Sequence, residues 1–357
     1  MAAESAPLDA TLNFIRALYG IVDVLRRAQG NAAAAAFGLD ASECGYQIVA
    51  SGPFWRLRDY GNHASSHSLL IVAAPIKRPY IWDLAPSASA IRYCLGNGLH
   101  VHLLEWLPAS QGIRNNGLDE YALAICDCIA KISVESAKPF LIGHSLGGTL
   151  AAIYGAWAPG TIRGLVLLGA PLCFEPERSR FRDALVSLVS PALSEADPFP
   201  GSLLSQMSAL ASPSTFIWSR LTDAALSLAD NRALEIHGRI ERWALDEVAL
   251  PGKLVHQIVE WLYRENRFFR GVLKIGRAHI GPSTLLVPTL AVVNTTDEVA
   301  PLDSIKPFAN AMPATNVRII EYPGEVGVCL QHLGLLVGRE ARMKVWPTII
   351  SWLNSQG

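Results

Sequence analysis

A short glycine-rich turn near the middle of the chain limits its fold more than any other stretch. The turn, residues 143–148, reads GHSLGG and lies between an apolar run at 139–142 and a small-residue run at 149–154. This is a G-x-S-x-G pattern between a predicted strand and a predicted helix, the arrangement of a nucleophile elbow, where only small neighbours fit around the serine. The oxygen of Ser145 is then exposed at the strand tip, and the N–H of Leu146 points toward it from the start of the helix, where it can stabilise an oxyanion.

Predicted strands and helices alternate on both sides of this turn. Residues 47–50 and 54–59 flank a Ser-Gly-Pro turn and are predicted to form a hairpin. Further strands are predicted at 69–74, 100–106, 140–142, 164–168, 287–294 and 317–322, and helices at 87–95, 118–134 and 340–353, the last with a kink or break at Pro347. Strands that alternate with helices favour a mostly parallel sheet covered on both faces, so the predicted fold class is α/β.

The alternation stops after residue 171, and residues 173–280 are predicted to form helices and loops. A stretch of roughly a hundred residues is too long for a loop, so we expect a helical cap over the strand tips. Its aromatic residues suggest an apolar acyl pocket, although such a set is more often plain core. They are Phe216, Trp218, Trp243, Trp261, Phe268 and Phe269. The predicted division is an N-terminal helical extension at 1–40, an α/β core at 41–171 and 284–357, and a cap insertion at 172–283.

The N-terminal segment has apolar residues at helical spacing from Leu8 to Ala28, with charged residues between them. This pattern predicts an amphipathic helix outside the catalytic core. Three roles remain open for it: packing on the core, contact with a partner subunit or a second copy of the chain, and contact with a lipid or polymer surface. The cap offers a second surface for such a partner.

Composition excludes several other classes of protein. The 357 residues carry a formal net charge of −1, so no basic surface indicates a nucleic-acid partner. Glu4, Asp9 and Arg16 interrupt the apolar residues at the N-terminus, which argues against a secretory signal. The uncharged run 139–162 is long enough to cross a bilayer, but its glycines, prolines and Ser-His pair fit a buried strand and helix better. The six scattered cysteines lack zinc spacing, and we expect free thiols in a cytoplasmic protein without a transmembrane segment.

A serine hydroxyl needs a base to take its proton and an acid to orient that base. Behind a nucleophile elbow these partners follow in the chain order serine, acid, histidine. Asp297 lies just after the predicted strand 287–294, and His332 lies after the predicted strand 317–322. We therefore predict Asp297 as the acid and His332 as the base. Glu298 is the close competitor for the acid.

Two more distant competitors for the acid, Glu175 and Glu177, follow the earlier strand. The second oxyanion donor is expected in the loop after the strand 69–74. That loop begins with Pro75, which has no N–H, so the backbone N–H of Ile76 is the candidate.

The other histidines are given no catalytic role. His144 is the variable position of the elbow, and His63 and His67 are expected in a loop. His100 and His102 share one face of a predicted strand, but the sequence offers no third ligand beside them. We therefore predict neither a metal site nor a cofactor.

Several stretches between about residues 47 and 353 carry a family resemblance. They are LIV at 70–72, RPYIWDL at 78–84, LDEY at 118–121, WALD at 243–246, PG at 251–252, IGR at 275–277, HLG at 332–334 and VWP at 345–347, with Asn266, Gly271, Asp297 and Pro301. Together they resemble the polyhydroxyalkanoate synthase branch of the α/β-hydrolase superfamily, above all its short two-subunit class. The resemblance implies an α/β-hydrolase core with a cap, and it carries the nucleophile, acid and base onto Ser145, Asp297 and His332.

One departure from that family concerns the nucleophile. The resemblance implies cysteine at the elbow, whereas this chain has Ser145. A cysteine forms a thioester that stays activated for transfer, but an acyl-serine is an ordinary oxyester, so hydrolysis is its expected fate. The sequence therefore predicts a serine esterase that acts on small to medium acyl esters. The alternatives are an acyltransferase or polymerase that uses hydroxyacyl-CoA with serine, and a non-catalytic relative that binds a ligand.

Overall fold

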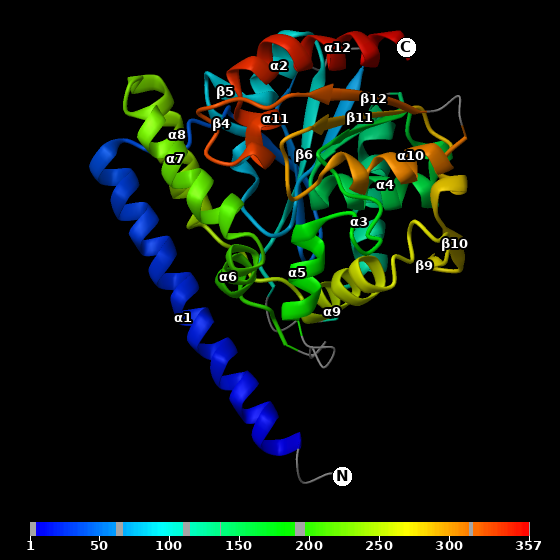
Figure 1. Cartoon of the computed structure of the whole chain (residues 1–357). Coiled ribbons are helices and arrows are strands. Elements are labelled where there is room, and N and C mark those ends of the chain that lie inside the picture. The colour runs from blue at the N-terminus through cyan, green and yellow to red at the C-terminus, as the bar shows by residue number, and fades with distance from the viewer. Residues whose placement is uncertain are drawn as a thin grey trace.

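The computed structural model describes residues 5–61, 67–109, 115–135, 137–189, 197–313 and 317–356. An eight-stranded sheet runs through its centre in the order β1-β2-β6-β3-β7-β8-β11-β12 (Figure 1). Its strands are β1 (Gln47–Ser51), β2 (Trp55–Asp59), β3 (Ser68–Val72), β6 (His100–Trp106), β7 (Phe140–His144), β8 (Gly164–Leu168), β11 (Thr289–Asn294) and β12 (Val317–Tyr322). The β1–β2 and β2–β6 pairs are antiparallel, and every other pair is parallel. The prediction of a hairpin followed by a mostly parallel sheet is confirmed.

Helices cover both faces of this sheet, which is why β3, β6, β7, β8 and β11 are buried at every residue. One face carries α3 (Leu118–Glu135), α4 (Leu146–Trp157) and α10 (Lys306–Ala311), and the other carries α2 (Ala90–Gly96), α11 (Gly334–Val337) and α12 (Trp346–Ser355) (Figure 1). Two apolar clusters fill the two layers. The uncharged run that could have crossed a bilayer forms β7 and α4 instead. No helix within the described ranges is long and apolar enough to span a membrane.

The last helix is interrupted where proline predicts it. A π-helical turn occupies Ala341–Val345, and Pro347 lies in the first turn of α12. Proline fits there because the first helical N–H groups have no partner within the helix.

The segment between β8 and β11 contains mostly helices. They are α5 (Arg180–Leu188), α6 (Gly201–Ala211), α7 (Ser219–Ser227), α8 (Asn231–Ala244) and α9 (Gly252–Gln257), with π-helical turns at Ser214–Trp218 and Ile258–Arg264. The prediction of helices and loops alone is wrong at the end of this segment, where β9 (Leu273–Ile275) and β10 (Ala278–Ile280) form a hairpin. Strands of three residues are too short to show a period, and Gly276 supplies the positive φ of the turn. A second short antiparallel pair is formed by β4 (Asp83–Ala85) and β5 (Ala88–Ser89), which are joined by a two-residue turn.

The aromatic residues of this segment have different surroundings. Phe268 is fully buried in the apolar cluster of α3 and α4, and Trp218 is largely exposed. The expectation that Phe268 lines an acyl pocket is therefore wrong, because the stretch from α9 to β10 packs against the helices of the core. Trp243 is the aromatic of the six that lines a pocket beside Ser145.

The N-terminal helix is longer than predicted, since α1 spans Ser5–Phe37 (Figure 1). It lies along α6 and α8. Asp23 is buried and accepts the N–H groups of Gly201 and Ser202 at the start of α6, at 3.1 and 2.8 Å. A carboxylate at this position caps α6 and complements its dipole.

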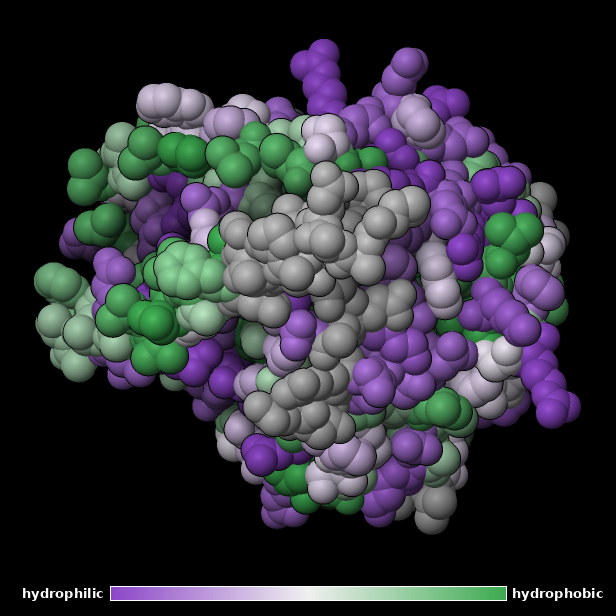
Figure 2. Space-filling view, turned by 90° about the horizontal axis from the view of Figure 1, so that it is seen from below, coloured by the Kyte–Doolittle hydropathy of each residue, from purple (hydrophilic) through white to green (hydrophobic). Residues whose placement is uncertain are grey.

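The other face of α1 is apolar and exposed. Its exposed side chains are Phe14, Leu18, Ile21, Val24 and Leu25. Figure 2 shows hydrophobic side chains gathered on the side of the molecule where α1 and α6–α8 lie, and polar ones on the opposite side. Of the three roles left open for this helix, the structure shows packing, against α6 and α8, and the apolar face is not covered by any of the described residues. The other two roles stay predictions.

Candidate active site

Ser145 lies on a strained turn between β7 and α4. Its φ of 55° and ψ of −133° fall outside the regions that ordinary residues occupy. Its N–H donates to the carbonyl of Leu168 at 3.0 Å, and its own carbonyl accepts the N–H of Thr149 at 3.0 Å, so the backbone is held on both sides. A Cβ on Gly147 would lie 2.3 Å from the carbonyl oxygen of Val72. Glycine is required there because the start of α4 passes so close to β3.

Asp297 and His332 lie together although they are far apart in sequence. Asp297 follows the end of β11, and His332 lies in the 3₁₀ turn Gln331–Leu333 after β12. Asp297 Oδ2 lies 2.6 Å from His332 Nδ1. The other carboxylate oxygen, Oδ1, accepts the N–H groups of Val299 and Ala300 at 2.8 and 3.2 Å.

The environment of Asp297 keeps it ionised. Burial raises the pKa of this carboxyl, but the charge and hydrogen bond of His332 and the two backbone N–H groups lower it by more, so the pKa lies below its ordinary value. An ionised carboxylate at Nδ1 orients an imidazole with its Nε2 lone pair outward and stabilises the imidazolium form.

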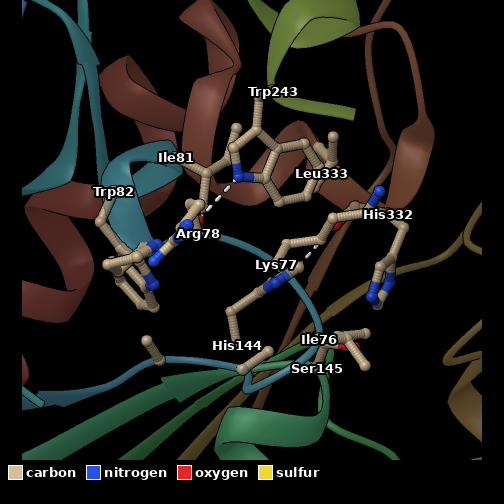
Figure 3. A pocket seen from close by; sticks show the side chains of 13 residues that line it. Ile76, Lys77, Arg78, Ile81, Trp82, His144, Ser145, Trp243, His332 and Leu333 are labelled. Atoms are coloured by element: carbon tan, nitrogen blue, oxygen red, sulfur yellow. Dashed lines mark hydrogen bonds between the residues drawn. The ribbon is translucent and has the colours of Figure 1, made fainter. Parts of the chain in front are cut away.

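His332 and Ser145 line the same pocket, which has a volume of about 70 Å³. His332 Nε2 is buried and accepts no hydrogen bond within the part of the chain that is described, so Ser145 is not bonded to it in this state. Such contacts often close only when substrate is bound. Figure 3 shows Ser145 at the tip of its strand, with His332, Lys77 and Trp243 around the pocket. The volume holds roughly five water-sized positions, which is room for a small group.

The competing acids point elsewhere. Glu298 accepts hydrogen bonds from Ser212, Ser214 and Thr215 beside α6, so its carboxylate faces the helical segment. Glu177 is exposed, and Glu175 pairs with Arg178 at 3.6 Å on a surface turn. Their contacts leave Asp297 as the carboxylate that meets His332.

Of the two candidate oxyanion donors, one lines the pocket and the other follows Ser145 in the chain. Leu146 is the first residue of α4, and Ile76 lies in the turn after β3 and lines the pocket. Beside it, Lys77 Nζ donates to Glu247 Oε1 at 3.1 Å. Burial lowers the pKa of Lys77 to about 8 against the opposing effect of Glu247. Arg26 of α1 binds the same fully buried carboxylate at 2.8 Å, so α1 reaches the loop that carries Ile76.

Sequence reasoning missed the part that His144 plays. Its Nε2 lies 2.7 Å from the carbonyl oxygen of His332, and the two rings lie 4.5 Å apart (Figure 3). Burial, together with the nearby His332, lowers the pKa of His144 to about 3, so the ring is neutral and Nε2–H donates to that carbonyl. The variable position of the elbow therefore holds the backbone of His332, a role that only the folded structure reveals.

Asp223 of α7 is a second residue that the sequence did not single out. Its carboxylate accepts the N–H groups of Gly327 and Cys329 at 2.6 and 2.8 Å, in the loop that leads to His332. His237 of α8 lies 3.1 Å from the same carboxylate. Asp223 thus ties α7 and α8 to the segment that carries His332.

The expectation that His100 and His102 have no third ligand is wrong. Asp59 at the end of β2 lies beside both, because β2 pairs with β6 in an antiparallel register. This contact joins residues about forty positions apart, and no sequence spacing reveals it. His63 lies outside the described residues.

Comparisons with known proteins bear on the family and the fold of the chain. The family with the alpha/beta hydrolase fold matches residues 85–325. The poly(3-hydroxyalkanoate) polymerase subunit of Haloferax mediterranei is 27% identical over 290 residues, which are 80% of this chain and 58% of the subunit. The corresponding subunit of Allochromatium vinosum is 25% identical over 292 residues, 81% of each chain. The chain thus spans less than two thirds of the length of the Haloferax subunit.

Solved structures show the same fold. A thermophilic esterase from Thermogutta terrifontis matches with a TM-score of 0.51 at 16% identity, over 87% of this chain and 98% of the esterase. A bacterial membrane phospholipase A matches with a TM-score of 0.50 at 15% identity, over 98% of this chain and 99% of that enzyme. At such identity the similarity establishes the fold and nothing finer.

Proposed function

The chain belongs to the α/β-hydrolase family, and from this premise we propose that it is a serine-dependent carboxylic ester hydrolase. The observation that carries the proposal is the 2.6 Å contact between Asp297 and His332 beside the pocket that Ser145 also lines. A buried acid-imidazole pair next to a strained serine is the arrangement that activates a hydroxyl for attack on a carbonyl.

In the proposed reaction, Ser145 Oγ attacks the ester carbonyl carbon while His332 Nε2 takes the hydroxyl proton. The N–H groups of Leu146 and Ile76 bind the oxyanion of the tetrahedral intermediate. His332 gives its proton to the leaving alkoxide, which departs as an alcohol and leaves an acyl-serine. Water then attacks the acyl-serine with His332 again as base, and the acid and free Ser145 are released.

A second candidate function comes from the relatives. Polymerase subunits that are 25–27% identical over about four fifths of this chain favour hydroxyacyl transfer by the same three residues. In that reaction a hydroxyl of a growing polyester, rather than water, would attack the acyl-serine. The two functions differ in the acyl donor of the first step, an oxyester or a CoA thioester, and in the nucleophile of the second step, so product analysis separates them.

The test supplies the purified enzyme with 3-hydroxybutyryl-CoA and, separately, with p-nitrophenyl butyrate. Ester hydrolysis predicts cleavage of the nitrophenyl ester and release of CoA with free 3-hydroxy acid, or no reaction with the thioester. The reason is that an acyl-serine holds no extra free energy over a polymer ester, while water is abundant. Chromatography of the products measures the outcome, and insoluble polyester from the wild type would replace the esterase by the polymerase.

Ser145→Cys is the companion variant for this test. If the nucleophile alone decides the fate of the acyl group, the variant should lose oxyester hydrolysis and gain some transfer from the thioester. A variant that gains none would indicate that the pocket and the acceptor path differ as well.

We expect Trp243 to limit the acyl length. Its ring lines the small pocket, and its Nε1–H donates to the carbonyl of Arg78 at 2.8 Å. Trp243→Ala should shift relative kcat/KM from acetyl toward hexanoyl and octanoyl esters, because each methylene that fits is worth about 1–3 kcal/mol. A p-nitrophenyl ester series of rising chain length measures this shift.

Two variants serve as controls for Trp243→Ala. Trp218→Ala removes an exposed ring outside the pocket and should leave the length profile unchanged. Trp243→Phe keeps one aromatic ring but removes the hydrogen bond to the carbonyl of Arg78 and the second ring of the indole, so it separates these losses from loss of the whole side chain. An equal loss of activity at every length, with a lower melting temperature, would show that Trp243 is structural instead.

A further inference from the structure

A second group of polar side chains lies at the opposite end of the sheet's strands from Ser145. Asp59 is the last residue of β2, and His100 and His102 are the first and third residues of β6. Residues two apart on a strand point to the same face, and Asp59 pairs directly with His102 across the strands. The three side chains are only 6%, 6% and 3% exposed. Ser145 follows the C-terminal end of β7, which runs parallel to β3 and β6, whereas His100 and His102 lie at the N-terminal end of β6.

Their ligand atoms have nearly the separations that a metal ion requires. His100 Nε2 lies 2.8 Å from Asp59 Oδ1, and His102 Nε2 lies 3.9 Å from Asp59 Oδ2. All three ligand atoms lie within 4.8 Å of one another. A tetrahedral ion with bonds of about 2.0–2.1 Å holds its ligand atoms roughly 3.3 Å apart. The two nitrogen–oxygen separations, 2.8 and 3.9 Å, lie on either side of that value, so small rotations of the rings would bring the ligand atoms to the spacing of a bound ion.

Both imidazole rings lie against the one carboxylate of Asp59. His100 makes a hydrogen bond with it, but 3.9 Å is too long for His102 to make one with Asp59. The two imidazole centroids nevertheless lie 4.2 Å apart beside one carboxylate. One ion placed between the rings and the carboxylate would be within reach of all three ligand atoms.

The carboxylate is prepared for such a role. The N–H of Gly61 donates to Asp59 Oδ1 at 2.7 Å and fixes its orientation, as outer contacts of metal ligands do. Two nitrogen ligands and one oxygen suit a divalent transition metal, whereas calcium and magnesium prefer oxygen alone.

A second cluster of similar composition does not fit a metal. His237, Glu241 and Cys329 also bring three ligand atoms together. There, Arg220 binds both carboxylate oxygens of Glu241, so a guanidinium already supplies the positive charge. A divalent cation would have to displace it.

We propose that Asp59, His100 and His102 bind one divalent transition-metal ion, zinc by preference, with water as the fourth ligand. The ion joins the end of β2 to the start of β6 and so fixes the antiparallel edge of the sheet. The role of the ion is structural, because the site lies at the opposite end of the strands from Ser145. Ester hydrolysis therefore does not depend on the ion, and the esterase proposal and the metal-site proposal can each be contradicted without the other.

Untagged protein, stripped with a chelator and dialysed, is titrated with Co²⁺ and followed by visible absorption, and bound Zn²⁺ is counted by elemental analysis. We expect one equivalent of either metal, tetrahedral Co²⁺ bands and a higher melting temperature with metal. His102→Gln should weaken Co²⁺ binding by at least about 100-fold, because loss of an outer contact alone costs 10–100-fold.

His279→Gln, at an exposed histidine, and His237→Gln, in the second cluster, are the matched controls and should bind Co²⁺ like the wild type. Should His102→Gln fail to fold, Asp59→Asn replaces it. Wild-type protein that binds no metal would overturn the proposal without any variant. Binding that survives in His102→Gln and disappears in His237→Gln would also overturn it.

Discussion

Ser145→Ala should abolish ester hydrolysis and leave the fold intact. In serine enzymes of this kind, loss of the nucleophile lowers kcat by about 10⁶-fold. Alanine keeps the Cβ and the backbone hydrogen bonds to Leu168 and Thr149 that hold the turn, so the substitution removes only the attacking oxygen. The measurement is kcat for p-nitrophenyl butyrate, with the melting temperature as the check on folding.

Ser187→Ala is the matched control, since this exposed serine bonds only to the carbonyl of Ala184 in its own helix. It should retain wild-type turnover. Turnover near the wild-type value in Ser145→Ala would mean that another residue forms the covalent intermediate, or that hydrolysis proceeds without one. Either result would end the proposed mechanism at its first step.

The central sheet was predictable because its strands are short apolar runs between turn residues. The predicted bounds of β6, β8 and β12 match the structure at both ends. Local pattern was enough there, since buried parallel strands must be apolar throughout. The β9–β10 hairpin was missed because three-residue strands carry no period, and its main signal was a single glycine, Gly276.

The contacts around the pocket depend on chain segments that meet only after folding. Order along the chain pointed to Asp297 and His332, which lie side by side. No pattern distinguished Trp243, which lines the pocket, from Phe268, which is buried in the core. Likewise, the register between β2 and β6 brings Asp59 to His100. A sequence identifies residue types suited to a task, but it does not contain the distances between them.

Asp297→Asn should lower kcat by about 10⁴-fold with little change in stability. The backbone N–H groups of Val299 and Ala300 hold the oxygen Oδ1 of Asp297, and an asparagine oxygen can accept both bonds in the same place. The new NH₂ group then replaces Oδ2 beside His332 Nδ1 and donates to it. His332 must carry its proton on Nε2 instead, and in that tautomer it cannot accept a proton from Ser145.

Glu298→Gln is the matched control, one residue further along the chain. Its side chain accepts hydrogen bonds from Ser212, Ser214 and Thr215, and a glutamine oxygen can still accept them, so kcat should fall by less than about tenfold. Both variants are compared by kcat for p-nitrophenyl butyrate between pH 6 and 9. A severe loss in Glu298→Gln with a mild one in Asp297→Asn would move the acid to Glu298. Mild losses in both would mean that His332 acts as the base without a carboxylate partner.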